Sequence, residues 1–108
     1  MKDDSIYIDH ILNSLNRILD YISGKDRESF EADLVTQDAV VRQLEIIGEA
    51  TKRVSKEFRS KHPDIPWSDM AGMRDVLIHD YIDVDFGVVW KTASEDIPNL
   101  KLLFLKLR

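Results

Sequence analysis

The chain has 108 residues, of which 44% are hydrophobic and 32% are charged, and its formal net charge is −5 at pH 7. This length and composition predict one globular domain, residues 1–108, with no room for a second. The absence of cysteine excludes disulfides and thiol chemistry.

The chain carries no visible targeting or membrane segment. Its first residues lack the basic start and the continuous apolar stretch of a signal peptide. The densest apolar run, from Leu100 to Leu107, is interrupted by lysine and is too short to cross a bilayer. We therefore expect a cytoplasmic protein with no membrane association, in agreement with the lack of cysteine.

Apolar residues at helical spacing predict a first helix, with Asp4 or Ser5 as its N-cap and Gly24 at its end. A polar connector of residues 25–33 follows, anchored by Phe30. A long second helix is then predicted from about Leu34 to about Ser60. Its apolar positions repeat in alternating threes and fours, at Val40, Leu44, Ile47, Thr51, Val54 and Phe58.

The proline-containing segment 63–67 predicts a rigid break, and Ser68 is the expected N-cap of a third helix. Its apolar positions are Met70, Met73, Leu77 and Tyr81. After a short acidic turn, Asp85 should cap a fourth helix, which Pro98 should kink or split, so that residues 100–107 form a fifth segment. With no convincing strand pattern, we predict an all-α, up-and-down bundle of four to five helices.

The most reactive combination of side chains lies in the third helix, at Arg74, Asp75, His79 and Tyr81. An arginine can hold a phosphate through two parallel hydrogen bonds, and a histidine can move a proton near neutral pH. Such a pair can cleave a phosphodiester that brings its own nucleophile, as RNA does with its 2′-hydroxyl. The sequence shows no metal-binding motif, so we expect neither a metal nor a cofactor.

Helical spacing makes Asp75 and His79 neighbours, so the carboxylate can orient the imidazole and favour its protonated form. Arg74 and His79, however, lie about 140° apart around a helix axis. Either the arginine side chain wraps round, or the helix ends near His79, or a second copy completes the site across a two-fold axis. A purely structural role for these residues stays open, because R-x4-H is frequent by chance.

A cluster of cations precedes the proline-containing break. Lys52, Lys56 and Arg59 are spaced at i, i+4 and i+7, which would place them on one face of the predicted long helix. They are candidates for contacts with RNA phosphates, although such a cluster is more often a solvated helix flank. The net charge of −5 also counts against a nucleic-acid partner.

The segment 74–81 matches the R-x4-H-x-Y hallmark of the HepT-like branch of the HEPN-domain toxins, and the chain resembles that family over nearly its whole length. Residues 37–50 resemble the family's long second helix, and residues 65–67 and 71–74 resemble its approach to the motif. Val84-Asp85 and Val89-Trp90 resemble the start of its last helix. The chain departs from the common pattern at Asp75, where asparagine is frequent, and this adds a negative charge beside an incoming phosphate.

The resemblance implies a metal-independent endoribonuclease that acts as the toxin of a toxin–antitoxin pair. Two protomers would build the catalytic cleft across a homodimer interface. The partner would be a nucleotidyltransferase antitoxin of the MntA type, which silences the toxin by attaching AMP to Tyr81. The alternative is a non-catalytic helical module that binds nucleotide or RNA through the Arg74 and His79 cleft. Growth arrest on expression alone would distinguish the enzyme from the module.

Overall fold

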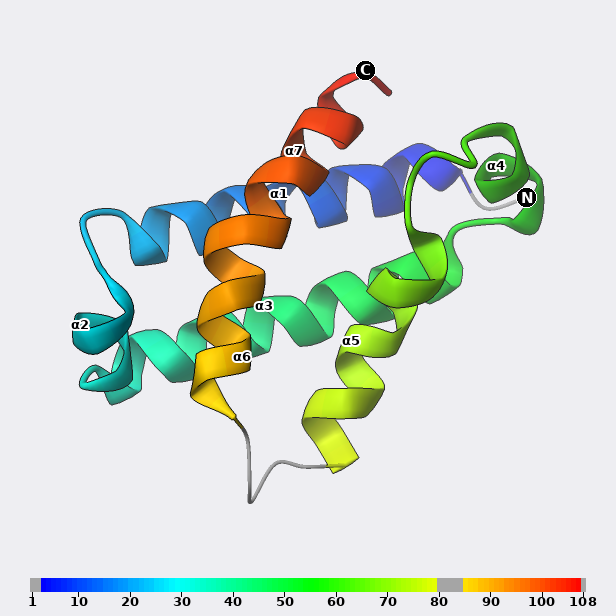
Figure 1. Ribbon diagram of the computed structural model, residues 1–108. Coiled ribbons are helices and arrows are strands. Elements are labelled where there is room, and N and C mark those ends of the chain that lie inside the picture. Colours follow the sequence, from blue (N-terminus) through cyan, green and yellow to red (C-terminus); the bar gives the residue numbers. More distant parts are fainter. Residues whose placement is uncertain (1–2, 80–84, 108) are drawn as a thin grey trace.

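A computed structural model describes residues 3–79 and 85–107, and Figure 1 shows their arrangement. The helices are α1 (Asp4–Ile22), α2 (Arg27–Glu31), α3 (Leu34–Arg53), α4 (Lys56–Lys61), α5 (Trp67–His79), α6 (Phe86–Lys91), the π-helical turn η1 (Thr92–Asp96) and α7 (Ile97–Leu105). The described residues contain no strand, so the predicted all-α class is confirmed.

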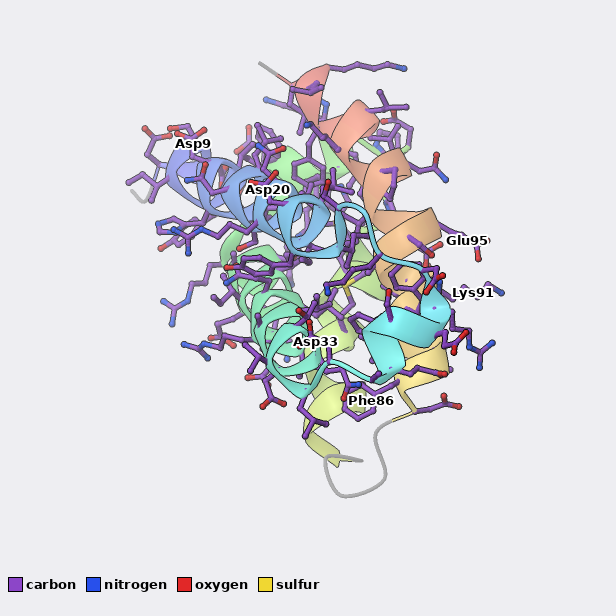
Figure 2. The ribbon with its side chains drawn as sticks, turned by 90° about the vertical axis from the view of Figure 1, so that its left-hand side faces the viewer. Asp9, Asp20, Asp33, Phe86, Lys91 and Glu95 are labelled. Carbon is purple, nitrogen blue, oxygen red and sulfur yellow. The ribbon has the colours of Figure 1, made fainter. Side chains whose placement is uncertain are left out.

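Four long columns carry the fold. Helices α1 and α3 run antiparallel, and α5 and the continuous α6–η1–α7 column pass steeply across them (Figure 1). Viewed along α1 and α3, with Asp33 at the near end of α3, the α6–η1–α7 column stands on one side of that pair (Figure 2). Helix α3 packs most extensively, against both α1 and α5, while α1 also packs against α7. The core therefore lies around α3.

The core contains the side chains that the helical periodicity selected. Of these, Ile11, Leu15, Ile18, Val40, Ile47 and Met70 have no exposed surface. Ile97 and Phe104 of α7 are equally buried, although the periodicity had not selected them. Phe30 is also fully buried, which confirms it as the anchor of the connector, and its ring lies 5.3 Å from that of Trp90. Among the described residues, no helix is both long enough and apolar enough to span a bilayer.

The predicted N-cap of the first helix was wrong by one residue, since Asp3 accepts the hydrogen bond from the Ser5 N–H at 2.9 Å. Gly24 follows the helix with a φ of +76°, a conformation that glycine adopts without steric cost. The connector also contains a helix that periodicity missed, because α2 is only five residues long. A reciprocal pair of hydrogen bonds between Asp26 and Ser29 caps it.

The predicted long second helix was also wrong, because it breaks after Arg53 and a separate helix, α4, starts at Lys56. Ser55 caps α4 by accepting the Phe58 N–H at 3.1 Å. Val54 is the C-cap of α3 and is still buried, at 2% exposure, although the chain changes direction there. The apolar repeat therefore continues through the break. A spacing of threes and fours thus reports which residues face the core, not whether the helix is continuous.

The predicted cap of the fourth helix is confirmed, whereas the predicted separation of a fifth segment at Pro98 is wrong, because the helix is continuous from α6 through η1 into α7. Asp85 caps α6 by accepting the N–H groups of Gly87 and Val88 at 2.9 and 3.2 Å. The column is not bent away at Pro98 but widens into η1, where the Ile97 N–H bonds to the Thr92 carbonyl, five residues back. Proline lacks an N–H and crowds the preceding turn, and a π-helical turn accommodates both effects without ending the helix.

Candidate functional site

Helix α5 carries the motif, and its first residue fixes it to the rest of the bundle. Trp67 starts the helix, one residue before the Ser68 that we predicted as its cap. The Trp67 indole donates to the His62 carbonyl at 2.9 Å, and its ring meets Phe104 edge-on at 5.8 Å. From this buried start α5 runs past α3 toward the lower edge of the molecule in Figure 1. The later part of α5, which bears the motif, is the end farther from this anchor.

Arg74, Asp75 and His79 all lie on α5, whose backbone is helical through His79. Asp75 and His79 are therefore helical neighbours at i, i+4, as the spacing predicts. The structure describes the backbone of residues 74–79, so the roles assigned to their side chains stay predictions. Tyr81 lies outside the described residues.

The register of α5 separates the arginine from the histidine. Position 74 continues the face that carries Trp67 and Met70, which are 7% and 0% exposed. Position 79 instead shares a face with Gly72, seven residues earlier. The two positions are about 140° apart around the axis and about 7.5 Å apart along it. One copy of α5 therefore directs positions 74 and 79 to different sides.

Two hollows flank α5. The one between α5 and α6 holds about 340 Å³. Its lining includes Leu44, Ser68, Asp69, Gly72, Met73 and Val88. The other, of about 250 Å³, lies between α5 and the η1–α7 column and shares Asp69 and Met73 with the first. These hollows give the motif helix open space on two sides, next to the residues that precede Arg74.

A third hollow, of about 500 Å³, lies between α1 and α3 and involves no residue of α5. Two arginines line it, but each has a glutamate within one helical turn. Arg42 lies 3.7 Å from Glu45, and Arg53 lies 3.5 Å from Glu49. Because these charges balance, the hollow offers no net positive charge to a phosphate.

The structure does not bring the predicted RNA-contacting cations together with the motif. Lys52 is in the last turn of α3, whereas Lys56 and Arg59 belong to α4. The expectation of a single helical face is wrong, because the helix breaks between Lys52 and Lys56. Helix α4 also lies beside the start of α5, at the end away from His79 (Figure 1).

No group of three or more histidine or acidic side chains that could hold a metal ion occurs within residues 3–79 and 85–107, as far as their side chains are described. The described carboxylates with altered acidity lie at helix starts. Hydrogen bonds from Ser5 and Ser29 lower the pKa values of Asp3 and Asp26, respectively. Such shifts are typical of N-caps and do not indicate a reactive centre.

Comparison with known proteins gives a coherent set of matches. The family model "Ribonuclease HepT-like" matches residues 11–107. A "Probable ribonuclease HepT" from Thermococcus cleftensis is 49% identical over 102 residues, covering 94% of this chain and 93% of that protein. A protein from Caldanaerobacter subterraneus subsp. tengcongensis with "Putative RNase" in its name is 45% identical over 101 residues, 94% of this chain and 90% of its own length.

A longer relative shows the same domain in another context. The "Gamma-glutamylcyclotransferase and putative RNase" of Methanocaldococcus jannaschii is 46% identical over 106 residues, which is 98% of this chain. The chain spans 48% of that protein's length. No solved structure gives a significant match.

Proposed function

Because the chain belongs to the HepT-like ribonuclease family, we propose that it is a metal-independent endoribonuclease that works as the toxin of a toxin–antitoxin pair. The observation that carries this proposal is the occurrence of Arg74, Asp75 and His79 on one helix, within a family match that covers residues 11–107. The ribonuclease names of relatives that this chain matches over nearly their whole length support the same reaction class.

The reaction would use the 2′-hydroxyl of RNA as the nucleophile. His79 takes the proton from this hydroxyl or gives one to the leaving 5′-oxygen, a transfer typically worth about 10²–10⁴-fold in rate. The 2′-oxygen attacks the adjacent phosphorus, the bond to the 5′-oxygen breaks, and a 2′,3′-cyclic phosphate remains. Arg74 stabilises the charged phosphorane, and Asp75 orients His79. The nucleophile is already tethered beside the phosphorus, so the substrate supplies part of the orientation.

A homodimer would resolve the separation between the two main groups. Because positions 74 and 79 face different sides of α5, Arg74 of one copy could meet His79 of the other across a two-fold axis. Lys56 and Arg59 lie far from His79 within one copy, so they would contact RNA outside the cleft or approach the partner's motif. Lys52, at the end of α3, would contribute in the same way.

Regulation would act at Tyr81, two residues beyond His79. A nucleotidyltransferase of the MntA type would attach AMP to the tyrosine hydroxyl. The added phosphate would place negative charge beside the cleft and repel RNA. In such a pair this chain is the modified partner.

The proposal is tested by RNA cleavage in the presence of a metal chelator. The wild type should cleave and leave 2′,3′-cyclic phosphate ends, whereas His79→Ala and Arg74→Ala should lose at least about a hundredfold in rate. Arg17→Ala and His10→Ala are matched controls, because they remove the same side-chain types from exposed positions on α1. Full activity in either motif variant would refute the assignment of its residue.

The alternative function is a non-catalytic module that binds nucleotide or RNA through the Arg74 and His79 cleft, and the net charge of −5 slightly favours it over an enzyme that must take up RNA. Expression in cells separates the two. An active toxin arrests growth when produced alone and is harmless with its antitoxin. A binding module leaves growth unchanged in both cases. If the protein is a toxin, its His79→Ala variant should also leave growth unchanged.

A further inference from the structure

We propose that the hollow between α5 and α6 holds one nucleobase of the RNA, next to the scissile phosphate, and that Asp69 makes it prefer a base with an exocyclic amino group. This inference rests on the proposed ribonuclease function and adds a specificity site to it. The occupant is one base of a single strand, because duplex bases are stacked and their faces are covered.

The lining of the hollow suits a base better than a sugar or a phosphate. Leu44, Met73 and Val89 supply apolar contacts, and the thioether of Met73 can lie favourably against an aromatic ring. Val88 borders the hollow with 57% of its surface exposed, so it offers further apolar surface to an occupant. The volume, about 340 Å³, lies within the range of small-molecule sites.

Gly72 leaves the mouth of the hollow open. A Cβ atom added to Gly72 would meet no other atom within 4 Å, so this helical position faces free space and not a packed neighbour. Any other residue would project a side chain there. A glycine inside a helix is less favourable than alanine, so its presence calls for a reason such as a ligand that must approach the backbone.

The register of α5 connects this hollow to the proposed chemistry. Gly72 and His79 lie on the same helical face, about 10 Å apart along the axis. One nucleotide and one histidine side chain together span a distance of that order. A base seated beside Gly72 would therefore leave its own or the neighbouring phosphate near position 79.

Asp69 supplies the polar contact at the edge of the hollow. It is exposed, and no hydrogen bond or ion pair with another described side chain engages its carboxylate. A carboxylate accepts hydrogen bonds and cannot donate them, so it can pair with the amino group of adenine, cytosine or guanine. Uracil offers no amino group, and its single donor, N3–H, lies between two carbonyl oxygens that the carboxylate would repel.

The test fills the hollow without altering the fold. The melting temperature of Gly72→Leu should equal or exceed that of the wild type, because leucine is the better helix former. The variant should nevertheless cleave a short unstructured RNA at least about tenfold less efficiently, mainly through a raised KM. Gly72→Ala should show a smaller loss. Asn13→Leu, which adds the same side chain at an exposed position of α1, is the matched control and should cleave normally.

Abasic substitution identifies the occupant. Single bases around the cleavage site are removed one at a time. At one position the missing base should lower cleavage efficiency by the wild type about tenfold but hardly lower that by Gly72→Leu, because both changes remove the same contact. Asp69→Asn should reduce the preference for an amino-bearing base over uracil at that position. Additive losses at every position, or unchanged cleavage by Gly72→Leu, would overturn the proposal.

A binding measurement keeps the inference separate from the proposed reaction. Fluorescence anisotropy of labelled oligoadenylate on His79→Ala, with and without Gly72→Leu, requires no catalysis. Binding weakened by the leucine supports the base site even if the wild type cleaves no RNA. Equal binding by the two variants contradicts the site even if the wild type is an active ribonuclease.

Discussion

The Asp4 carboxylate accepts two hydrogen bonds from Ser55, one from its backbone N–H at 2.8 Å and one from its hydroxyl at 2.7 Å. This contact joins the first turn of α1 to the point where the predicted long helix breaks. Ser55 in turn caps α4, so one serine ends one helical direction and starts the next. The start of α1 thereby holds α4, which leads the chain into the motif helix.

Asp4→Ala should lower the free energy of unfolding by about 1–2 kcal/mol, because two hydrogen bonds to a charged acceptor are lost near the surface. Urea unfolding measures the change. Asp38→Ala, which removes an exposed carboxylate of α3 that has no hydrogen bond or ion pair to the other described residues, is the control. A double-mutant cycle with Ser55→Ala should show coupling, and additive effects would contradict a direct link.

Gln37 should be the most sensitive polar residue of the described core. It is 2% exposed, and its side-chain amide donates to the Phe30 and Glu31 carbonyls at 2.9 and 2.7 Å. Gln37→Leu keeps similar bulk but leaves both carbonyls without these donors, so we expect a loss of about 2–3 kcal/mol in urea unfolding. Gln37→Glu should be at least as harmful, because a carboxylate cannot donate. A loss below about 0.5 kcal/mol in Gln37→Leu would show that water replaces the donor.

Acid should weaken the fold through the start of α3. A hydrogen bond from Lys25, followed by hydrogen bonds from Thr36, holds the pKa of Asp33 well below its usual range. A carboxyl whose pKa is lower in the folded state contributes stability above its unfolded pKa of about 3.9, and this is lost as pH falls further. Urea midpoints measured from pH 7 to pH 2 should therefore drop below about pH 4. Asp33→Asn should make this drop shallower, and an identical slope would refute the assignment.

Mixing two inactive variants tests whether the site is shared between copies. In a homodimer of Arg74→Ala with His79→Ala, one composite site keeps both wild-type groups and the other keeps neither. Random exchange of subunits should therefore restore about a quarter of wild-type activity. If each copy uses its own arginine and histidine, the mixture stays inactive. Each variant mixed with itself is the control for exchange alone.

Mass spectrometry tests the proposed regulation. The protein produced with an MntA-type nucleotidyltransferase should carry the mass of AMP on the peptide that contains Tyr81, and it should lose RNA cleavage. Tyr81→Phe should accept no AMP and stay active in the presence of the transferase. The same protein produced alone provides the unmodified reference. Modification at Tyr7 or Tyr21 and not at Tyr81 would contradict the proposal.

The sequence by itself predicted the helical class, most of the buried residues and the helix that carries the motif. It could do so because apolar spacing records which side of each helix avoids water. Val54 shows what apolar spacing does not report, because it is buried as its spacing predicts although α3 has already ended at Arg53. At the break Ser55 donates hydrogen bonds to Asp4, fifty-one residues away, and no local pattern reports such a contact.

Tertiary structure alone decided the surroundings of the motif. The position of α6 beside α5 creates the hollow at Gly72, which in the sequence is only a helix-weakening residue. The break before α4 separates Lys52 from Lys56 and Arg59, which the spacing had placed on one face. Local sequence fixes the direction of residues around one helix, whereas the space beside that helix depends on which other segments pack against it.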